Sequence, residues 1–569
     1  MKNHKLLIIA ATAGVLLGSN VQVAEAAKKS SKDAQIASLI RRLEILEQRL
    51  AIDEGKEPGK LGGKTSASKV ADADVPAVKQ LDQKIKILER KLEVEHEVAA
   101  DNAKKASKVE MGPEGLRWTS PEGDHTVRLH AALQADAKFF MDDNAATTIA
   151  PTAGSSSYPS TLPGALPNGI NLADTFQLKQ ARIGVQGTLF KYFDFNVLPD
   201  WGKGATLLQY AYLDVRYLPY ASLSIGKQKT PLSLERIQGD SDGTFLERGY
   251  PTQLASNRDV GIMLHGSFAK PGEQRVPIIN PNPLDSRNFF TYQLGVFNGS
   301  GDNGTAANMN DTANQDNKDF IGRIFAHPFQ KSGIKPLEGL GIGVAGSYSN
   351  LNQSTTVLNN LVSANGQNTI VNYSLPGANA AFLSADGAHY RVYPQLYWYY
   401  GPFGLMGEYA LSSQRLQATK IGTNPFPQTQ TLHITENNQA WQIWASYVLT
   451  GEDVTFQGVR PRKPFDPFNG NWGALQFTAR YTELDIDNSV YENQGINNTA
   501  ANRFVFLDPS KSIKQATGWA LGINWYLNRN VLVRSDYEQT YFQGGSGTAT
   551  NVLSRQMEKV FSTRFQVSF

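Results

Sequence analysis

Apolar and polar residues alternate along most of the chain, from residue 126 to the C-terminus, and loops rich in Asn, Gly, Ser, Thr and Pro interrupt the alternation. In the first such segment Val127 and Leu129 fall on one face, whereas Arg128 and Asp136 fall on the other. A period of two is that of a β-strand whose two faces meet different surroundings. The pattern therefore predicts a chain built mainly of strands.

The number and spacing of these segments indicate a barrel. We count about sixteen of them, and bacterial outer-membrane barrels have an even number of strands, with short turns on one side and long loops on the other. Short connections lie at 190–192, 218–220, 401–402 and 528–530, and long polar ones lie at 141–173, 230–257, 299–317, 350–387, 416–437 and 485–514. The connections 269–288 and 450–470 are long although they fall on the side of the short turns. Either the strand count slips there or these two turns are unusually elaborate.

Aromatic residues are frequent in the alternating segments. The chain has 22 Tyr, 27 Phe and 8 Trp, and it ends on Phe569 with Phe561 and Phe565 on the same face. Aromatic girdles at the two membrane interfaces explain them better than a soluble β-sandwich, which needs few aromatic side chains on outward faces. We predict an all-β transmembrane barrel of about 16 antiparallel strands over residues 111–569, in the outer membrane of a bacterium.

The N-terminus has the order of a secretory signal. Lys2 and Lys5 precede an apolar run over 6–17, and the small-residue site Ala24-Glu25-Ala26 follows. The run is shorter than the ~20 apolar residues that a permanent membrane helix needs. We therefore predict a signal peptide at 1–26.

A heptad pattern comes next. Apolar residues recur at alternating spacings of three and four over 36–50 and again over 78–92, with a Gly- and Pro-containing linker at 53–76. This pattern predicts helices that associate through an apolar seam, because short isolated helices are marginal in water. We predict a periplasmic α-helical coiled-coil and linker region at 27–110, which could contact the cell wall or a periplasmic partner. An amphipathic helix packed on a globular domain is the alternative.

Composition narrows the classes of function. The absence of Cys among 569 residues removes disulfides and thiolate metal sites, and a net charge of +3 gives no sign of a nucleic-acid partner. The eight His have no metal-ligand spacing, and we find no phosphate-binding loop or activated nucleophile. We predict no enzyme activity, no catalytic residue, no metal site and no cofactor. An enzyme site assembled from residues distant in sequence is the weakest alternative.

Arginines recur on the face that strand parity places opposite the lipid. They are Arg128, Arg182, Arg216, Arg323, Arg480, Arg534 and Arg564. On the lipid face at mid-membrane an arginine costs roughly 2–4 kcal/mol, whereas an inward guanidinium can bind phosphate oxygens two at a time. A basic inner wall also raises the local concentration of anions. We predict that the seven line the pore and bind anions. The alternative is that they pair with inward acids such as Asp136, Asp214 and Glu408 and brace the wall.

A second basic group lies in and around the connection 230–257, which is the third connection on the side of the long loops. Its members are Lys227, Lys229, Arg236, Arg248 and Arg258. A connection of this length could fold into the pore and set its narrowest point. Acids in the same segment favour a solvated mixed-charge loop equally for each residue, and strict parity places Lys227 and Lys229 on the outward face.

Short motifs run in a fixed order through residues 181–482. They are ARIGVQGTLF at 181–190, GKQKTPLSLE at 226–235, RDVG at 258–261, GVFNG at 295–299, SYVLTGE at 446–452, KPF at 463–465, WGAL at 472–475 and ARY at 479–481. Together they resemble the phosphate-selective porin O and P family. The resemblance implies a sixteen-stranded, trimeric, water-filled barrel with arginines on its inner wall and a basic constriction formed by infolded loops.

Two functions are compatible with these patterns. In the first, the chain is an outer-membrane porin through which phosphate, polyphosphate or other small anions diffuse passively. In the second, it is an envelope tether or adhesin-like barrel whose coiled coil binds the cell wall or a periplasmic partner, with general non-selective pore activity. The helical extension favours the second, because a diffusion channel does not require it.

Overall fold

The computed structural model describes residues 106–112, 114–142, 172–204, 206–218, 220–268, 288–304, 317–351, 358–373, 380–421, 429–492, 505–548 and 551–569, and helical backbone at 87, 90, 93, 94 and 97. The chain divides into a unit from Met1 to Val98 and a unit from Ala99 to Phe569. The expected signal peptide and nearly all of the expected coiled coil lie outside the described residues. All the described strands lie in the second unit.

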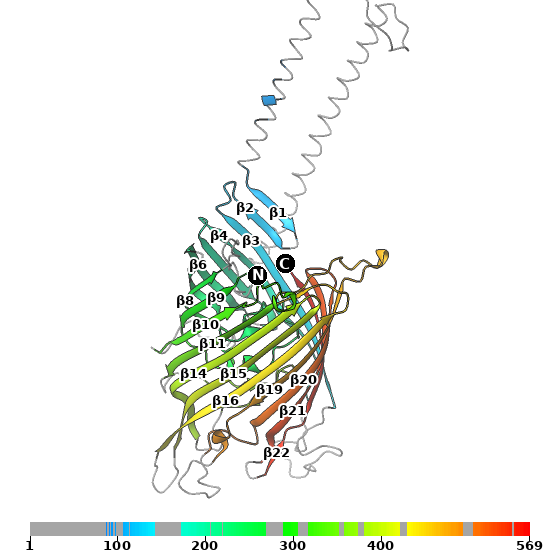
Figure 1. Ribbon diagram of the computed structural model, residues 1–569. Coiled ribbons are helices and arrows are strands. Elements are labelled where there is room, and N and C mark those ends of the chain that lie inside the picture. The colour runs from blue at the N-terminus through cyan, green and yellow to red at the C-terminus, as the bar shows by residue number, and fades with distance from the viewer. Residues whose placement is uncertain are drawn as a thin grey trace, which may run out of the picture. The chain divides into compact units, whose positions relative to one another are not determined.

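Strands dominate the second unit (Figure 1). The barrel strands are β3 (Thr126–Met141), β4 (Thr175–Leu189), β5 (Phe193–Asp200), β6 (Leu207–Leu218), β7 (Ala221–Lys229), β8 (Arg258–Phe268), β9 (Phe290–Phe297), β10 (Asp319–Ala326), β11 (Leu340–Leu351), β14 (Ala380–Tyr400), β15 (Phe403–Ile421), β16 (Thr429–Val448), β19 (Ala474–Asp485), β20 (Ile513–Tyr526), β21 (Val531–Gly547) and β23 (Glu558–Ser568). Each pairs antiparallel with its neighbours, and β23 pairs with β3, which closes the sheet. The described strands thus form a closed barrel of sixteen antiparallel strands, which confirms the barrel part of the predicted fold class.

Three further strands extend this sheet. The hairpin of β1 (Lys108–Gly112) and β2 (Gly115–Thr119) continues it from the start of β3, and β22 (Val552–Ser554) pairs with the end of β21. The boundary expected between residues 110 and 111 therefore lies inside β1.

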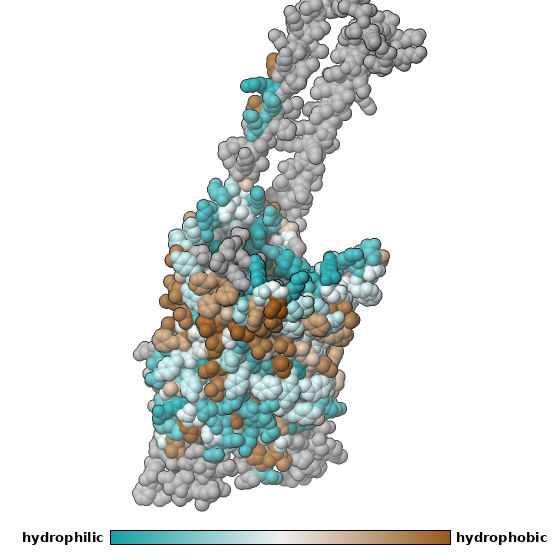
Figure 2. All heavy atoms as spheres, in the orientation of Figure 1, coloured by the Kyte–Doolittle hydropathy of each residue, from teal (hydrophilic) through white to brown (hydrophobic). Residues whose placement is uncertain are grey.

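Alternation along the strands separates an apolar outside from a polar inside. In β4, Ile183 is 55% exposed on the outer face, whereas the neighbouring Arg182 is 8% exposed on the inner face. Figure 2 shows apolar side chains gathered in a belt nearer the barrel end that carries β1 and β2, and mostly polar side chains toward β22. The belt is the surface that suits the hydrocarbon of a bilayer.

The connections mostly follow the prediction. The connections between β8 and β9 and between β16 and β19 join strands at the end of the short turns, so the strand count did not slip, and the second connection contains a short hairpin. The expected loop at 416–437 is wrong, because β15 continues to Ile421 and β16 begins at Thr429. These strand ends carry polar residues on both faces, such as Thr435 outside and Glu436 inside, so the sequence loses its apolar period there.

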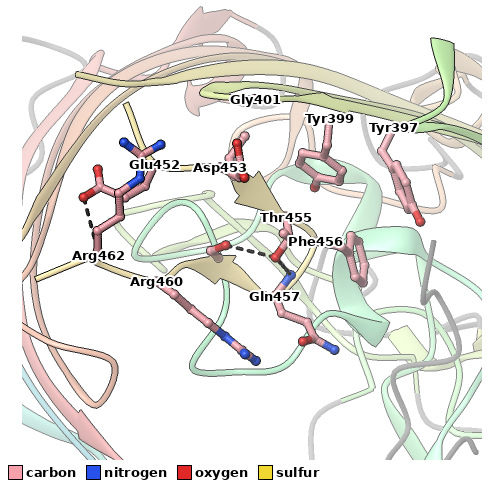
Figure 3. Close-up of a pocket in the computed structure, with 13 residues that line it drawn as sticks. Tyr397, Tyr399, Gly401, Glu452, Asp453, Thr455, Phe456, Gln457, Arg460 and Arg462 are labelled. Atoms are coloured by element: carbon pink, nitrogen blue, oxygen red, sulfur yellow. Dashed lines mark hydrogen bonds between the residues drawn. The ribbon is translucent and has the colours of Figure 1, made fainter. Parts of the chain in front are cut away.

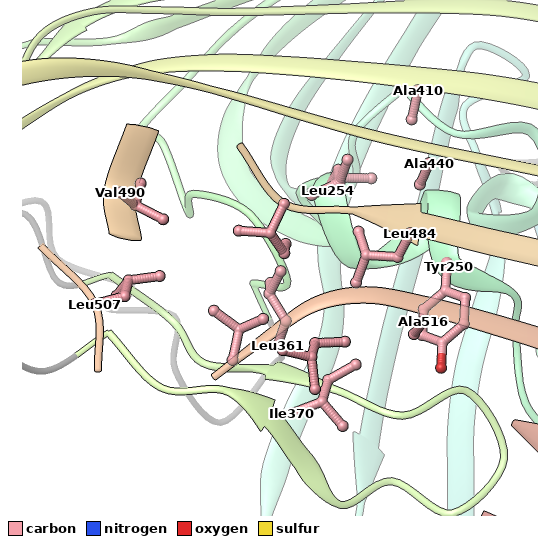
Figure 4. Close-up of a cluster of buried hydrophobic side chains, with 14 of the residues drawn as sticks. Tyr250, Leu254, Leu361, Ile370, Ala410, Ala440, Leu484, Val490, Leu507 and Ala516 are labelled. Carbon is pink, nitrogen blue, oxygen red and sulfur yellow. The ribbon is translucent and has the colours of Figure 1, made fainter. Parts of the chain in front are cut away.

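The connection 230–257 lies inside the barrel and is almost entirely buried. It contains α3 (Leu234–Ile237) and η2 (Tyr250–Leu254). A second inward segment is the hairpin of β12 (Leu361–Val362) and β13 (Thr369–Val371). Leu254, Leu361 and Ile370 pack in one apolar cluster with side chains of the wall and of other connections (Figure 4). Two connections that are distant in the sequence therefore form a single core within the barrel.

The remaining elements are short. They are η1 (Gly202–Gly204), η3 (Lys335–Leu337), η4 (Pro467–Asn469), η5 (Asn488–Tyr491), and the hairpin of β17 (Val454–Thr455) and β18 (Gly458–Val459) in the connection between β16 and β19. Within the described part of the chain, no helix is both long enough and apolar enough to span a bilayer.

Candidate functional site

The infolded segment 230–257 is held against the opposite wall of the barrel. Ser233 caps α3 and donates a hydrogen bond to the Glu408 carboxylate on β15, to which the Leu234 amide also donates at 2.8 Å. Farther along, the Tyr250 amide donates to Thr482 Oγ1 at 3.0 Å. These contacts fix the segment across the interior of the barrel.

Asp240 of this segment is surrounded by four cationic side chains. Arg258 Nη2 lies 2.5 Å, Arg248 Nη2 2.8 Å and Lys229 Nζ 3.2 Å from its carboxylate, and Arg182 also donates to it. Burial by itself would raise the pKa of Asp240, but these four cations hold it well below its usual range. Asp240 therefore stays ionised at all physiological pH values.

A second cationic group surrounds Glu247 of the same segment. Lys138 Nζ lies 3.1 Å from Glu247 Oε1, Lys179 also donates to this oxygen, and Arg564 Nη2 lies 4.0 Å away. Burial would raise the pKa of Glu247, but Lys138, Lys179 and Arg564 hold it well below its usual range. The segment thus carries two carboxylates, each within a basic pocket of the wall.

Three of the predicted wall arginines bind the backbone of the infolded segment. Arg534 Nη1 donates to the Phe245 carbonyl at 3.2 Å, Arg564 Nη1 to the Leu246 carbonyl at 2.8 Å, and Arg480 Nη1 to the Glu247 carbonyl at 2.8 Å. Sequence reasoning placed these guanidiniums inside but did not foresee what they contact. Three consecutive backbone carbonyls of the infolded segment thus accept hydrogen bonds from these three guanidinium groups.

Most wall arginines also form ion pairs with acids. Arg182 pairs with Asp200 at 2.7 Å, Arg216 with Asp194 at 2.8 Å, and Arg564 with Asp136 at 2.6 Å. Arg480 pairs with Glu538, and Arg128 lies 3.6 Å from Glu114 near the start of β3. Of the acids considered from sequence, Asp136 pairs with an arginine, Asp214 contacts His265, and Glu408 contacts Ser233 and Leu234.

Among the described residues Arg323, Arg236 and Arg534 form no ion pair with a carboxylate, and each donates to neutral groups instead. Arg323 is 3% exposed and donates to Gln293 Oε1 at 3.3 Å, while its Nε and Nη2 are buried without a hydrogen-bond partner. The guanidinium of Arg236 donates to the Thr252 carbonyl, from Nε at 3.2 Å and from Nη2 at 2.6 Å. Arg323 thus retains two unused donors inside the barrel.

The parity assigned to Lys227 and Lys229 needs correction. Both are buried, and Lys229 Nζ donates to the Gln238 carbonyl at 2.7 Å inside the barrel. The alternation is interrupted at Gly226, whose φ of +125° is a conformation that other residues rarely adopt. The glycine was the sequence signal for this interruption.

Several inward charged residues were missed in the sequence. Lys138 shares the inward parity of Asp136 and could have been included. Arg391 of β14 is 2% exposed and pairs with Asp302 at 2.6 Å and Asp319 at 2.9 Å, which ties the connection after β9 to the wall. Strand parity would have found Arg391, but no local pattern indicates its partner Asp302.

The interior thus gathers guanidinium and ammonium groups together with many carboxylates, and guanidinium groups are donors that suit carboxylate and phosphate oxygens. The described residues contain no group of three or more His, Asp or Glu side chains positioned to hold a metal ion.

Several solved structures of outer-membrane proteins are similar to this chain at low sequence identity. The chain is similar to the trimer form of OmpT from Vibrio cholerae (12% identity, TM-score 0.41, covering 78% of this chain and 99% of that one). It is similar to the outer membrane channel DcaP of Acinetobacter baumannii (8%, 0.42, 79% and 98%) and to an anion-selective porin from Comamonas acidovorans (9%, 0.41, 78% and 100%). No curated protein matches the chain. The family described as phosphate-selective porin O and P matches residues 167–569, and the chain belongs to that family.

Proposed function

We propose that this outer-membrane porin passes small anions, with phosphate-like anions preferred, past the infolded segment 230–257. The observation that carries the proposal is the Asp240 cluster. Arg182, Lys229, Arg248 and Arg258 supply four basic groups, whereas Asp240 and Asp200 supply two acidic ones, so the cluster is net positive. A net positive constriction attracts anions and repels cations.

The arginines have two roles in this proposal. Arg480, Arg534 and Arg564 hold the infolded segment in place through its carbonyl groups. Arg323, which pairs with no described carboxylate and donates to Gln293, adds positive potential along the path of an anion. A planar guanidinium suits phosphate, whose oxygens accept two parallel hydrogen bonds. Release stays fast because each site replaces only part of the hydration shell of the anion.

Planar-bilayer recordings on the purified protein test the proposal. Under a KCl gradient the reversal potential should show preference for chloride, and inorganic phosphate should block the chloride current. Arg323→Gln should raise the half-blocking phosphate concentration about tenfold, which corresponds to about 1.4 kcal/mol. The matched control is Arg529→Gln, which removes an arginine that is exposed near the short-turn end. A cation-selective reversal potential, or block unaltered by Arg323→Gln, would contradict the proposal.

The extension outside the described residues has a separate role in our proposal. We expect a cleaved signal peptide at 1–26, a periplasmic coiled coil that tethers the barrel to the cell wall or a periplasmic partner, and a homotrimer. Since β1 begins at Lys108, a deletion that tests tethering should stop at residue 105. Unchanged conductance together with a fragile outer membrane would support tethering, and a normal envelope would contradict it.

A further inference from the structure

A cavity of about 650 Å³ lies at the short-turn end of the barrel, apart from the Asp240 cluster. Its wall comes from the end of β14, from the turn at Gly401 and from the β17–β18 hairpin. Phe456 of the hairpin is fixed to the infolded segment, because its carbonyl accepts a hydrogen bond from Gln238 Nε2 at 2.8 Å. The cavity is therefore built from anchored elements and has the size of sites that hold a small organic molecule.

One side of this cavity is aromatic. Tyr397 and Tyr399 project inward from β14, and Tyr397 stacks on Phe456 with ring centroids 5.4 Å apart (Figure 3). His327 Nδ1 donates a hydrogen bond to the Asn288 carbonyl. His327 Nε2 therefore accepts a hydrogen bond from the Tyr397 hydroxyl, at 2.6 Å. The Tyr399 hydroxyl, in contrast, is buried without a hydrogen-bond partner. Flat rings and one unused hydroxyl together suit a ligand that has a ring and a polar group.

Another part of the cavity is basic. Arg460 has no ion pair or hydrogen bond with any described residue, and Figure 3 shows its side chain extending into the space beside Gln457. Arg462 donates from Nη2 to the Gly451 carbonyl at 2.6 Å, and its amide faces Glu452 Oε1 at 3.4 Å. The lining also contains Glu452, which accepts from the Arg462 amide, and Asp453, and these two acids disfavour a ligand with several negative charges. The set fits one anionic group on a flat ring.

We infer that this cavity is a binding site for small aromatic anions, of the class of aryl phosphates and aryl carboxylates. The ring of the ligand packs against the aromatic side formed by Tyr399, Tyr397 and Phe456, and its anionic group binds Arg460. The inference extends beyond the proposed function and does not depend on it, since the cavity binds a ring whether or not the constriction selects anions. It adds organic anions to the molecules that the protein recognises.

Calorimetric titration of the full-length protein in detergent tests the site with phenyl phosphate and with inorganic phosphate as probes. Phenyl phosphate should bind at least tenfold more tightly than inorganic phosphate. Phe456→Leu should abolish this preference, and Arg460→Gln should weaken phenyl phosphate binding about tenfold. Lys463→Gln is the matched control, because it removes a positive charge from the same connection outside the cavity lining.

The result that overturns the inference is equal affinity for the two probes, or full phenyl phosphate affinity in both Phe456→Leu and Arg460→Gln. If Phe456→Leu does not fold, Tyr399→Leu replaces it, with folding checked by circular dichroism. Failure of the proposed function would appear separately, as a cation-selective reversal potential of the unaltered protein.

Discussion

Arg564 donates from Nε and Nη2 to both carboxylate oxygens of Asp136, at 2.6 and 2.7 Å, across the seam where the last strand of the barrel pairs with the first. Both side chains are almost fully buried. Since the two residues are 428 positions apart, the pair joins the ends of the barrel sequence. It is a bidentate, charge-assisted contact at the point where the sheet closes.

Asp136→Asn should destabilise the barrel by about 3–5 kcal/mol, because it removes the nearest counter-charge of the buried Arg564 guanidinium and leaves only the more distant Glu247. Urea unfolding of the refolded protein in detergent micelles measures the loss. Glu114→Gln is the control, since it removes the exposed partner of Arg529 and should cost only about 0–1 kcal/mol. Equal losses in the two variants would mean that the seam pair has no special role.

Asp240→Asn should make the pore more selective for anions. The substitution removes one negative charge from among four cations while leaving the size of the side chain unchanged. The half-blocking concentration of phosphate should fall on the order of tenfold. Asp485→Asn removes the same charge from the end of β19, where Asp485 contacts Gln515, and should leave the block unaltered. Weaker block in Asp240→Asn would show that the carboxylate positions the cations for anion binding.

The pH dependence of selectivity should follow Asp242. Burial raises the pKa of Asp242 to about 6, and Lys229 only partly offsets this effect. The carboxyl group is therefore mostly ionised at pH 7 and mostly neutral at pH 5, so the interior becomes more positive as the pH falls through about 6. Preference for anions should rise over this interval. Because the fold favours the neutral carboxyl, stability should also rise as the pH falls.

Reversal potentials at pH 5, 6 and 7 measure this effect, and Asp242→Asn is the comparison. Any other group that titrates over the same interval changes the charge in both proteins. The contribution of Asp242 is the difference between the two proteins, which should be large at pH 7 and vanish at pH 5. A constant difference at all three pH values would contradict the assignment.

Sequence periodicity predicted the wall of the barrel because each barrel strand has one face toward lipid and one face toward the polar interior. Arg182 and Arg564 could be placed inside from parity alone, since their neighbours Ile183 and Phe565 need the lipid. Their partners could not be found in this way. Asp240 and Leu246 lie in an irregular connection, where no period relates a residue to the wall that it contacts. The sequence therefore left open whether these arginines bind anions or brace the barrel wall. In the structure they pair with acids of the wall, and Arg564 also donates to the infolded segment.

Gly226 shows where parity fails. Its φ is +125°, and a Cβ atom there would lie 2.2 Å from the Ala211 carbonyl oxygen. Gly226→Ala should therefore force β7 away from β6 and cost at least about 1–3 kcal/mol from backbone strain alone. Because Lys229 follows by three residues, its contacts with Asp240 and Gln238 should loosen as well. We expect a lower urea midpoint and faster proteolysis within 230–257.

Two other glycines separate the causes of this effect. Gly451 has a φ of +83° but open space where a Cβ would lie, so Gly451→Ala introduces strain without a clash. Gly322 has no positive φ, and its nearest atom would be the flexible Leu294 Cδ2 at 3.2 Å, so Gly322→Ala should be nearly neutral. Gly226→Ala should lose more stability than either, and it alone should expose the infolded segment to protease. If the segment stays resistant in Gly226→Ala, the inward position of Lys229 does not depend on the bend at Gly226, and the wall contacts of Asp240 must be sufficient to hold it.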